Sequence, residues 1–368
     1  MDNTVKEPLI HLSKREDMPS GKRWLVRIAA IFLSLVVCAG FIFMIIKMNP
    51  VEVYEGIVEG AVGTSRRFWV TARDALTLLC VAVAVTPAFK MKFWNIGAEG
   101  QILMGCVASA AMMIYAGNAL PTGVLLVLMF LCSFVAGAIW GVIPAFFKAK
   151  WNTNETLFTL MLNYVAMQVV TFCIVYWENP VGSNSVGIIN APTKAGWLPP
   201  LFGLDYGWNL VIVLLLTVFM FIYMKRTKHG YEISVVGESE NTAKYVGIKV
   251  EKVIMRTVVL SGAICGLVGL LLVGGINHTI TTTIAGGQGF TAVLVSWMSK
   301  FNPLTMVFSS FLIIFMNRGA SEISTNFGLN QSYSDILTGI ILFFIIGCEF
   351  FISYQLQSRK KAEKKEVK

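Results

Sequence analysis

Long apolar runs separated by short polar stretches repeat along nearly the whole chain. The first run, residues 28–46, contains 19 residues and no charge, which corresponds to about 28 Å of helix and is enough to cross a bilayer. The apolar positions are continuous rather than alternating, so they predict helices and not barrel strands. We therefore expect an all-α fold, a polytopic integral membrane protein with about ten transmembrane helices.

Ten apolar runs are candidate spans. They are residues 28–46, 76–89, 102–115, 122–147, 156–176, 208–224, 253–274, 289–298, 304–316 and 336–354. The run 76–89 is short and crosses only if residues 69–75 extend it. The run 289–298 is the weakest, and eight spans are expected if it and a neighbour are re-entrant.

The distribution of basic residues predicts the orientation. With ten spans and the N-terminus inside, 24 of the 30 Lys and Arg residues fall on cytoplasmic segments. This imbalance predicts that both termini are cytoplasmic and that the number of spans is even. It also explains the net charge of +9 as an orientation signal, so we expect no nucleic-acid partner.

Composition supports the same class. The chain is 55% apolar and only 14% charged, well below the charged fraction of a soluble protein. The expected organisation is a cytoplasmic tail over residues 1–27, a transmembrane domain over 28–354 and a basic cytoplasmic tail over 355–368. The seven cysteines lie in apolar runs without a CxxC pair, which predicts reduced, packed thiols. The first apolar run is long enough to remain as an anchor rather than be cleaved.

Two segments are expected outside. Residues 178–207 carry four prolines together with glycines and asparagines, which predicts an irregular surface. The stretch "GGINHTITTTIAGGQG" at 274–289 carries no charge, and its Gly and Thr residues favour close helix approach or a re-entrant turn. The sequence has no GxxxxGK[ST] loop and no hydrolase motif. We expect no catalytic residue, no metal site and no directly bound cofactor.

The stretch "FWNIGAEGQ" at 93–101 interrupts the apolar pattern between two short runs. A Gly-rich polar break of this kind is typical of a discontinuous helix that lines a transport path. Asn95, Glu99 and Gln101 are therefore candidate substrate-path residues. The alternative is that the stretch is a cytoplasmic turn after Lys90 and Lys92, and that Glu99 caps the next helix.

Two polar residues within apolar runs have similar alternatives. Asn163 lies midway along 156–176; it either bonds to a neighbouring helix or lines the path. Glu349 near the end of the last span is expected to reach water or a basic residue near the inner interface.

A cytoplasmic segment, "TKHGYEISVVGESENTAKYVGIKVEKV" at 227–253, has the layout of a short capped helix. Ser239 or Asn241 can cap it, Glu240 lies in its first turn, and Gly247 can end it. This regular layout favours a short exposed helix between two spans over an ordinary solvated loop.

Several motifs in order resemble one family. "VGESENTAKYVGI" and "SGAICGLVGLLL" (261–272) are similar to the coupling segment of permease subunits of ATP-binding-cassette importers, in the branch for branched-chain amino acids, simple sugars and nucleosides. "FWNIGAEGQILMG", "NETLFTLMLNYVA", "FNPL" and "SDILTGIILFFIIGCEFF" fit the same branch. The resemblance covers roughly residues 25–355, and it is nearest to the nucleoside permeases that work with basic-membrane-protein-type lipoproteins.

The resemblance implies a coupling segment at 227–252 that docks on an ATPase subunit, where ATP is bound and hydrolysed. The residues it assigns to docking are Gly237, Glu238, Asn241, Ala243, Tyr245 and Gly247. One departure is Ser239-Glu240, where the family usually shows Asn-Pro.

The resemblance further implies a bacterial plasma-membrane importer that works by alternating access. The implied partners are two ATPases, a second homologous permease forming a heterodimer, and an extracytoplasmic substrate-binding lipoprotein. A nucleoside is the expected substrate and a simple sugar the alternative. An ion-coupled secondary transporter is a further alternative, for which only Glu99 and Glu349 offer intramembrane ionisable groups.

Overall fold

The computed structural model of the chain describes residues 10–15, 18–201, 203–204, 206–326, 328 and 330–358. Most of the expected tail 355–368, and residues 1–9 and 16–17 of the expected tail 1–27, lie outside the described residues. The chain forms two compact units, one of residues 68–314 and one of residues 1–67 with 315–368.

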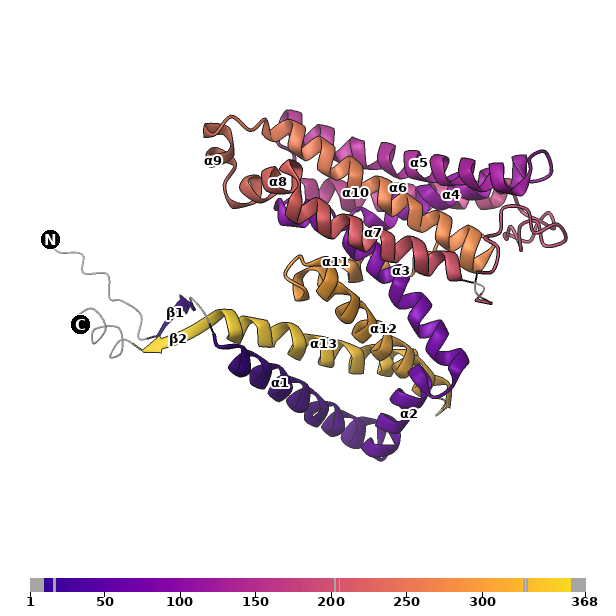
Figure 1. Cartoon of the computed structure of the whole chain (residues 1–368). Coiled ribbons are helices and arrows are strands. Elements are labelled where there is room, and N and C mark those ends of the chain that lie inside the picture. The colour runs from indigo at the N-terminus through magenta and orange to yellow at the C-terminus, as the bar shows by residue number, and fades with distance from the viewer. Residues whose placement is uncertain are drawn as a thin grey trace. The chain divides into compact units, whose positions relative to one another are not determined.

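The larger unit is a helical bundle (Figure 1). It contains most of α3 (Ser65–Lys90), then α4 (Ala98–Ala116), α5 (Thr122–Trp151), α6 (Glu155–Tyr176), α7 (Gly207–Arg226), α8 (Lys228–Glu238), α9 (Glu240–Tyr245), α10 (Val250–Leu272), the π-helical turn η2 (Val273–Asn277), α11 (Gln288–Met298) and the first part of α12 (Pro303–Asn326). Helices α8 and α9 lie at one end of the bundle, and the loop 177–206 lies at the other (Figure 1).

Helix α10 is the centre of this unit, since 83% of its span is buried. It packs on α4 and α5 through glycines that allow close contact. A Cβ on Gly266 would meet the carbonyl oxygen of Ser133, and one on Gly105 would meet that of Gly266. Small residues at helix interfaces bring backbones close enough for dispersion contacts, which are a main source of stability within a membrane.

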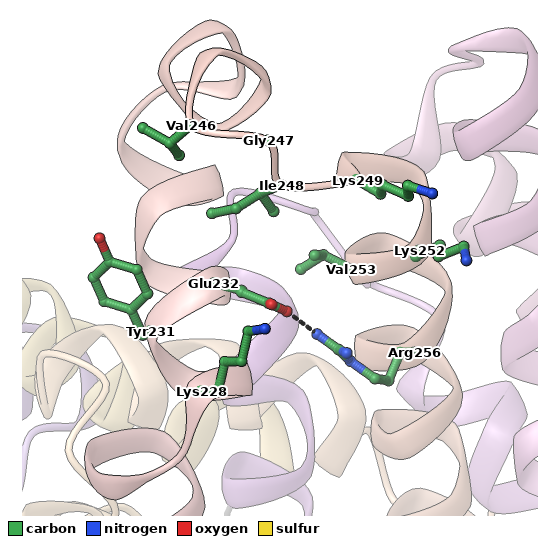
Figure 2. A pocket seen from close by; sticks show the side chains of 10 residues that line it. All are labelled: Lys228, Tyr231, Glu232, Val246, Gly247, Ile248, Lys249, Lys252, Val253 and Arg256. Carbon is green, nitrogen blue, oxygen red and sulfur yellow. Dashed lines mark hydrogen bonds and ion pairs between the residues drawn. The ribbon is translucent and has the colours of Figure 1, made fainter.

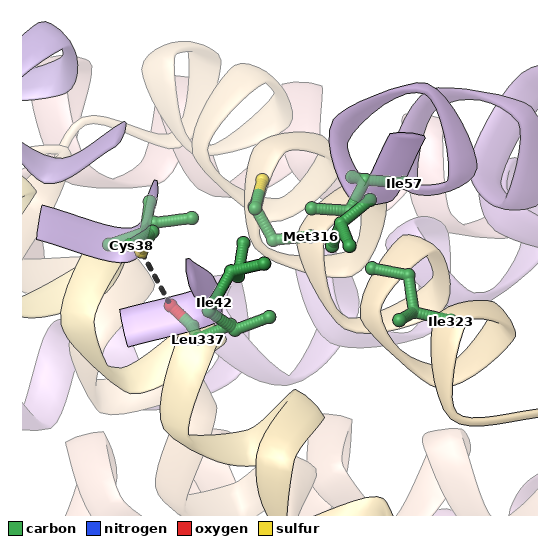
Figure 3. Close-up of a cluster of buried hydrophobic side chains, with 8 residues drawn as sticks. Cys38, Ile42, Ile57, Met316, Ile323 and Leu337 are labelled. Carbon is green, nitrogen blue, oxygen red and sulfur yellow. Dashed lines mark hydrogen bonds between the residues drawn. The ribbon is translucent and has the colours of Figure 1, made fainter. Parts of the chain in front are cut away.

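The smaller unit contains β1 (Ile10–Lys14), α1 (Ser20–Phe41), the π-helical turn η1 (Ile42–Ile46), α2 (Pro50–Val62), the rest of α12, α13 (Gln331–Ser353) and β2 (Tyr354–Ser358). Its core is a cluster of aliphatic and sulfur side chains from α1, η1, α2, α12 and α13 (Figure 3). In that cluster the Sγ of Cys38 lies 3.8 Å from the carbonyl oxygen of Leu337. The thiol is free, as expected.

Polar contacts fix the helices of the smaller unit. Arg27 on α1 pairs with Glu349 on α13 at 2.5 Å, which confirms that Glu349 reaches a basic residue. Arg67 pairs with Glu322. Tyr54 on α2 donates to the carbonyl oxygen of Leu35, and burial raises the pKa of Tyr54 to about 12, so the phenol stays a donor at neutral pH.

Among the described residues, nine helices are long and apolar enough to cross a membrane, which confirms the all-α polytopic class. The run 76–89 is extended upstream as expected, because α3 begins at Ser65. The only departure from the all-α expectation within the described ranges is the short antiparallel pair of β1 and β2. This pair joins the start of α1 to the end of α13.

Candidate functional site

The stretch 93–101 forms a turn between α3 and α4, and each of these helices is long enough to cross alone. The expected discontinuous helix at this position is therefore wrong, and the alternative, a turn, is confirmed. Asn95 is fully buried. Its Nδ2 donates to the Oγ of Ser261 on α10 (3.2 Å), and its Oδ1 accepts from the backbone N–H of Gly97 (3.2 Å). The amide of Gln101 lies 3.4 Å from that of Asn95.

Asn163 joins the same turn to α6. Its Oδ1 accepts from the backbone N–H of Gly100 (2.8 Å), and its Nδ2 donates to the carbonyl oxygen of Ile96 (2.9 Å). The expected bond of a buried amide to a neighbouring element is thus confirmed. Asn95, Gln101 and Asn163 are each at most 2% exposed, so in this conformation they hold the turn in place.

Glu99 takes a different position from the one expected for a helix cap. It lies in the first turn of α4, but its carboxylate accepts from the backbone N–H groups of Gly287 (2.9 Å) and Gly289 (2.8 Å), at the start of α11. The N-terminus of a helix carries unsatisfied donors and partial positive charge. Glu99 therefore caps another helix, 188 residues further along the chain.

Residues 278–298 connect the two ends of the larger unit. At one end the carbonyl oxygen of His278 accepts from the N–H of Ile189, in the outer loop. At the other, Ser296 donates to the carbonyl oxygen of Ala82 (3.1 Å), and Trp297 stacks on Trp94 at a centroid distance of 5.6 Å. Helix α11 has only 11 residues, about 16 Å and half of a bilayer core. Residues 278–287 before it are irregular, and the helix is not among the nine that are long and apolar enough to cross in the described part of the chain.

Sequence reasoning marked 274–289 as a possible re-entrant segment but named no site residue in it. Thr281 and Thr283 are exposed, and the Oε1 of Gln288 is buried without a hydrogen-bond partner in the described part of the chain. Irregular backbone at membrane depth occurs where it is buried in protein or lines a water-filled cavity. These three side chains are therefore further candidate path residues.

The two outer segments expected from sequence lie against each other. The ring of Trp197 stacks on that of His278 at a centroid distance of 3.7 Å, and the N–H of Leu198 donates to the carbonyl oxygen of Gly274. Asn190 donates to the carbonyl oxygens of Met113 and Ala195. The segments therefore form one surface on this end of the larger unit.

At the opposite end, α9 has complete caps at both ends. The Oγ of Ser239 accepts from the N–H of Thr242 (3.2 Å), and Glu240 lies in the first turn. Gly247 has φ +80°. The N–H of Ile248 donates to the carbonyl oxygen of Ala243, and the N–H of Gly247 donates to the carbonyl oxygen of Lys244. This is the Schellman arrangement, so the expected short helix is confirmed, with Ser239 rather than Asn241 as its cap.

The six residues expected to dock divide into two groups. Gly237 and Ala243 are buried, and a Cβ on Gly237 would meet the carbonyl oxygen of Lys90. The other four are exposed; they are Glu238, Asn241, Tyr245 and Gly247. Tyr245 is 92% exposed. A docked partner therefore has Tyr245 available, while Gly237 and Ala243 fix the element to the bundle.

A basic pocket of about 500 Å³ lies between α8 and the start of α10 (Figure 2). Glu232 and Arg256 form an ion pair across it (2.5 Å), and a guanidinium nitrogen of Arg256 lies 3.2 Å from the Nε2 of His229. Three lysines also line the pocket, Lys228, Lys249 and Lys252. The ion pair ties α8 to α10, so the segment 227–252 is joined to the central helix of the bundle.

The larger unit is thus a bundle of candidate membrane spans with a short capped helix, α9, in the segment between α7 and α10. Residues 70–346 match the family model described as "Branched-chain amino acid transport system / permease component". The chain belongs to this family of importer permeases of the ATP-binding-cassette class, and it is a multi-pass protein of the bacterial plasma membrane.

Several curated relatives align over most of the chain. The glucose ABC transporter permease protein TsgB13 of Haloferax volcanii is 27% identical and covers 94% of this chain and 93% of its own. The nucleoside ABC transporter permease protein NupB of Lactococcus lactis is 26% identical, over 94% and 96%. The guanosine ABC transporter permease protein NupP of Bacillus subtilis is 27% identical, over 87% and 92%. The resemblance inferred from the motifs is thereby confirmed.

Proposed function

We propose that this chain is the permease subunit of an ATP-driven nucleoside importer. The observation that carries the proposal is the α8–α9 element, which presents Tyr245 on a short, doubly capped helix tied to α10. A rigid helix moves as one body when the cleft that holds it closes. Closure of an ATPase dimer would then be transmitted through the Glu232–Arg256 ion pair to α10, and from α10 to the helices packed on it. ATP is proposed to bind to the ATPase subunit, since this sequence has no GxxxxGK[ST] loop.

Nucleoside is the first choice of substrate because relatives named for nucleoside and guanosine transport align over most of the chain. A simple sugar is the second candidate, since a glucose permease is equally similar. The polar groups proposed to contact either substrate in this conformation are Thr281, Thr283 and Gln288. A second set of candidate path residues consists of Asn95, Glu99, Gln101 and Asn163. The buried amides and Glu99 contact substrate only if the turn or α11 moves.

The proposed partners follow from the two ends of the larger unit. Two ATPases dock at residues 227–252, and a lipoprotein delivers substrate to the surface formed by residues 177–207 and 274–289. A second, homologous permease completes the path. Two different guanosine permease proteins of Bacillus subtilis, NupP and NupQ, are similar to this chain, which supports a heterodimer. Both termini and residues 227–252 are proposed to be cytoplasmic, as the distribution of basic residues predicts.

The test is gentle solubilisation from the native membrane followed by identification of the proteins that co-purify. An ATPase subunit together with a second permease is the expected result, and nucleosides delivered by the lipoprotein should then stimulate ATP hydrolysis. Recovery of the chain alone after crosslinking would make 227–252 an ordinary loop and favour an ion-coupled transporter.

A further inference from the structure

Two hollows meet on the surface of the larger unit where α5 ends and α10 begins. One is the basic pocket of Figure 2. The other, about 640 Å³, lies between α5 and α10. Lys252 and Arg256 line both, so the two hollows adjoin at these side chains, and together we call them the α5–α10 groove.

The part of the groove between the helices is apolar. Its walls include Phe134, Phe146, Met255, Val259, Leu260 and Ala263. Phe146 is 45% exposed, and only 22% of the α5 span is buried within the chain. This wall therefore lies on a face of the bundle that a lipid chain can reach.

The end of the groove is strongly basic. Five cationic side chains line it, Lys150, Lys228, Lys249, Lys252 and Arg256, against two carboxylates, Glu232 and Glu251. Lys150 and Lys252 are exposed, and Glu232 is already paired with Arg256. An anion bound here meets more positive than negative charge.

The groove places its charges and its apolar wall in the same order as the headgroup and the acyl chains of a phospholipid. Helix α5 ends at Trp151 and α10 begins at Val250, so Lys150 and Lys252 lie at helix ends, where these two spans would leave a bilayer. The apolar wall continues from them toward the middle of both helices. Clusters of Lys and Arg at this level attract anionic headgroups, and their stems pack on apolar neighbours.

We propose that the α5–α10 groove binds an anionic phospholipid. Its phosphate contacts Lys150, Lys252 and Arg256, and one acyl chain lies along Phe146, Val259 and Leu260. A soluble phosphate would use only the basic pocket and leave the apolar wall uncovered, which is why the lipid is favoured. Because Gly247 and Ile248 line the same pocket, the bound headgroup contacts the link between α9 and α10. The proposal does not depend on which substrate is transported.

Native mass spectrometry of the purified full-length chain with added dioleoyl phosphatidylglycerol tests this proposal. We expect saturable binding that dioleoyl phosphatidylcholine does not reproduce. The double variant Lys150→Gln/Lys252→Gln should weaken binding by roughly fivefold for each lysine removed. The matched control is Lys225→Gln/Arg226→Gln, which removes two exposed charges at the same end of the bundle but outside the groove; it should bind like wild type.

The variant Val259→Trp tests the acyl-chain part, since it fills the groove without changing a charge; binding should fall although all five cations remain. Three results would overturn the proposal. The first is equal binding of phosphatidylcholine, and the second is competition by glycerol 3-phosphate that is as effective as competition by the lipid. The third is crosslinking of the variant Val259→Cys to another protein subunit in the native membrane. The second would identify a soluble anion as the ligand, and the third a protein.

Discussion

The carboxylate of Glu99 accepts a hydrogen bond of 2.8 Å from the backbone N–H of Gly289, and so joins the first turn of α4 to the start of α11. A Cβ on Gly289 would lie 2.6 Å from the backbone nitrogen of Glu99, so only glycine permits this approach. Residues 93–101, the most recognisable stretch of the sequence, thus hold the N-terminus of the half-length helix in place.

Replacing Glu99 with glutamine should destabilise the protein. The amide keeps the volume, but its NH₂ group cannot accept, so one of the two N–H groups loses its partner at a cost of about 1–3 kcal/mol. We expect a lower midpoint in thermal unfolding of the purified chain and faster hydrogen exchange at residues 287–289. Glu55→Gln, at an exposed carboxylate on α2, is the control. Unchanged exchange in Glu99→Gln would show that the carboxylate does not cap α11.

Replacing Gly266 with alanine should separate the central helix from α5. The added Cβ would meet the carbonyl oxygen of Ser133, and overpacking of this kind costs about 1–3 kcal/mol. The yield of monodisperse protein and its thermal midpoint should both fall. Gly123→Ala makes the same change at a helical position with nothing within 4 Å and should raise or preserve stability. Equal behaviour of the two variants would contradict the close packing of α10.

Converting Ser239-Glu240 to Asn-Pro should preserve α9. Asparagine is as good an N-cap as serine, and proline is favoured at the first helical position, where it loses no bond. Ser239→Ala removes the N-cap and should instead destabilise α9 by about 1 kcal/mol. Hydrogen exchange over residues 240–248 measures the stability of α9 in both variants. Relative to the unchanged protein, exchange should be equal or slower in the Asn-Pro variant and faster in the alanine variant. The reverse order would argue against the cap.

Replacing Tyr245 with alanine should abolish ATP-driven uptake and leave membrane insertion and thermal stability unchanged. The ring is 92% exposed, so its loss creates no cavity in this chain and removes only the proposed contact with an ATPase. Phe343→Ala, at an aromatic side chain 73% exposed on α13, should transport normally. Replacement of Glu238 by a residue that disrupts docking should act like Tyr245→Ala. Normal uptake by variants that insert correctly would contradict the proposal that residues 227–252 dock on the ATPase.

The helices and the α9 caps could be predicted because local rules determine them. Length and apolarity define a span. Ser239, Glu240 and Gly247 stabilise the ends of α9 through interactions with residues only a few positions away in the sequence. The contact between Glu99 and Gly289 could not, because it joins residues 190 positions apart in sequence. A discontinuous helix was expected at 93–101, where the structure has a turn between α3 and α4. A re-entrant turn was one expectation for 274–289, where the structure has an irregular stretch that leads into the short helix α11. Both stretches have glycines and polar groups, and only the three-dimensional path distinguishes a turn from a broken span.

The pairing of β1 with β2 was not predicted either. Its strands, Ile10–Lys14 and Tyr354–Ser358, are short and lie at opposite ends of the sequence, in segments where composition indicates solvated tails. Their register depends on the packing of α1 against α13, which brings the two segments together. Local pattern has no information on that proximity.

Uptake by proteoliposomes tests the central claim most directly. The chain would be reconstituted with the ATPase, permease and lipoprotein that co-purify with it, and labelled nucleoside would be supplied on the lipoprotein side. The proposal predicts accumulation that requires ATP on the ATPase side, persists when proton and sodium gradients are collapsed, and is competed by unlabelled nucleoside but not by simple sugars. Accumulation that follows an ion gradient without ATP would contradict it.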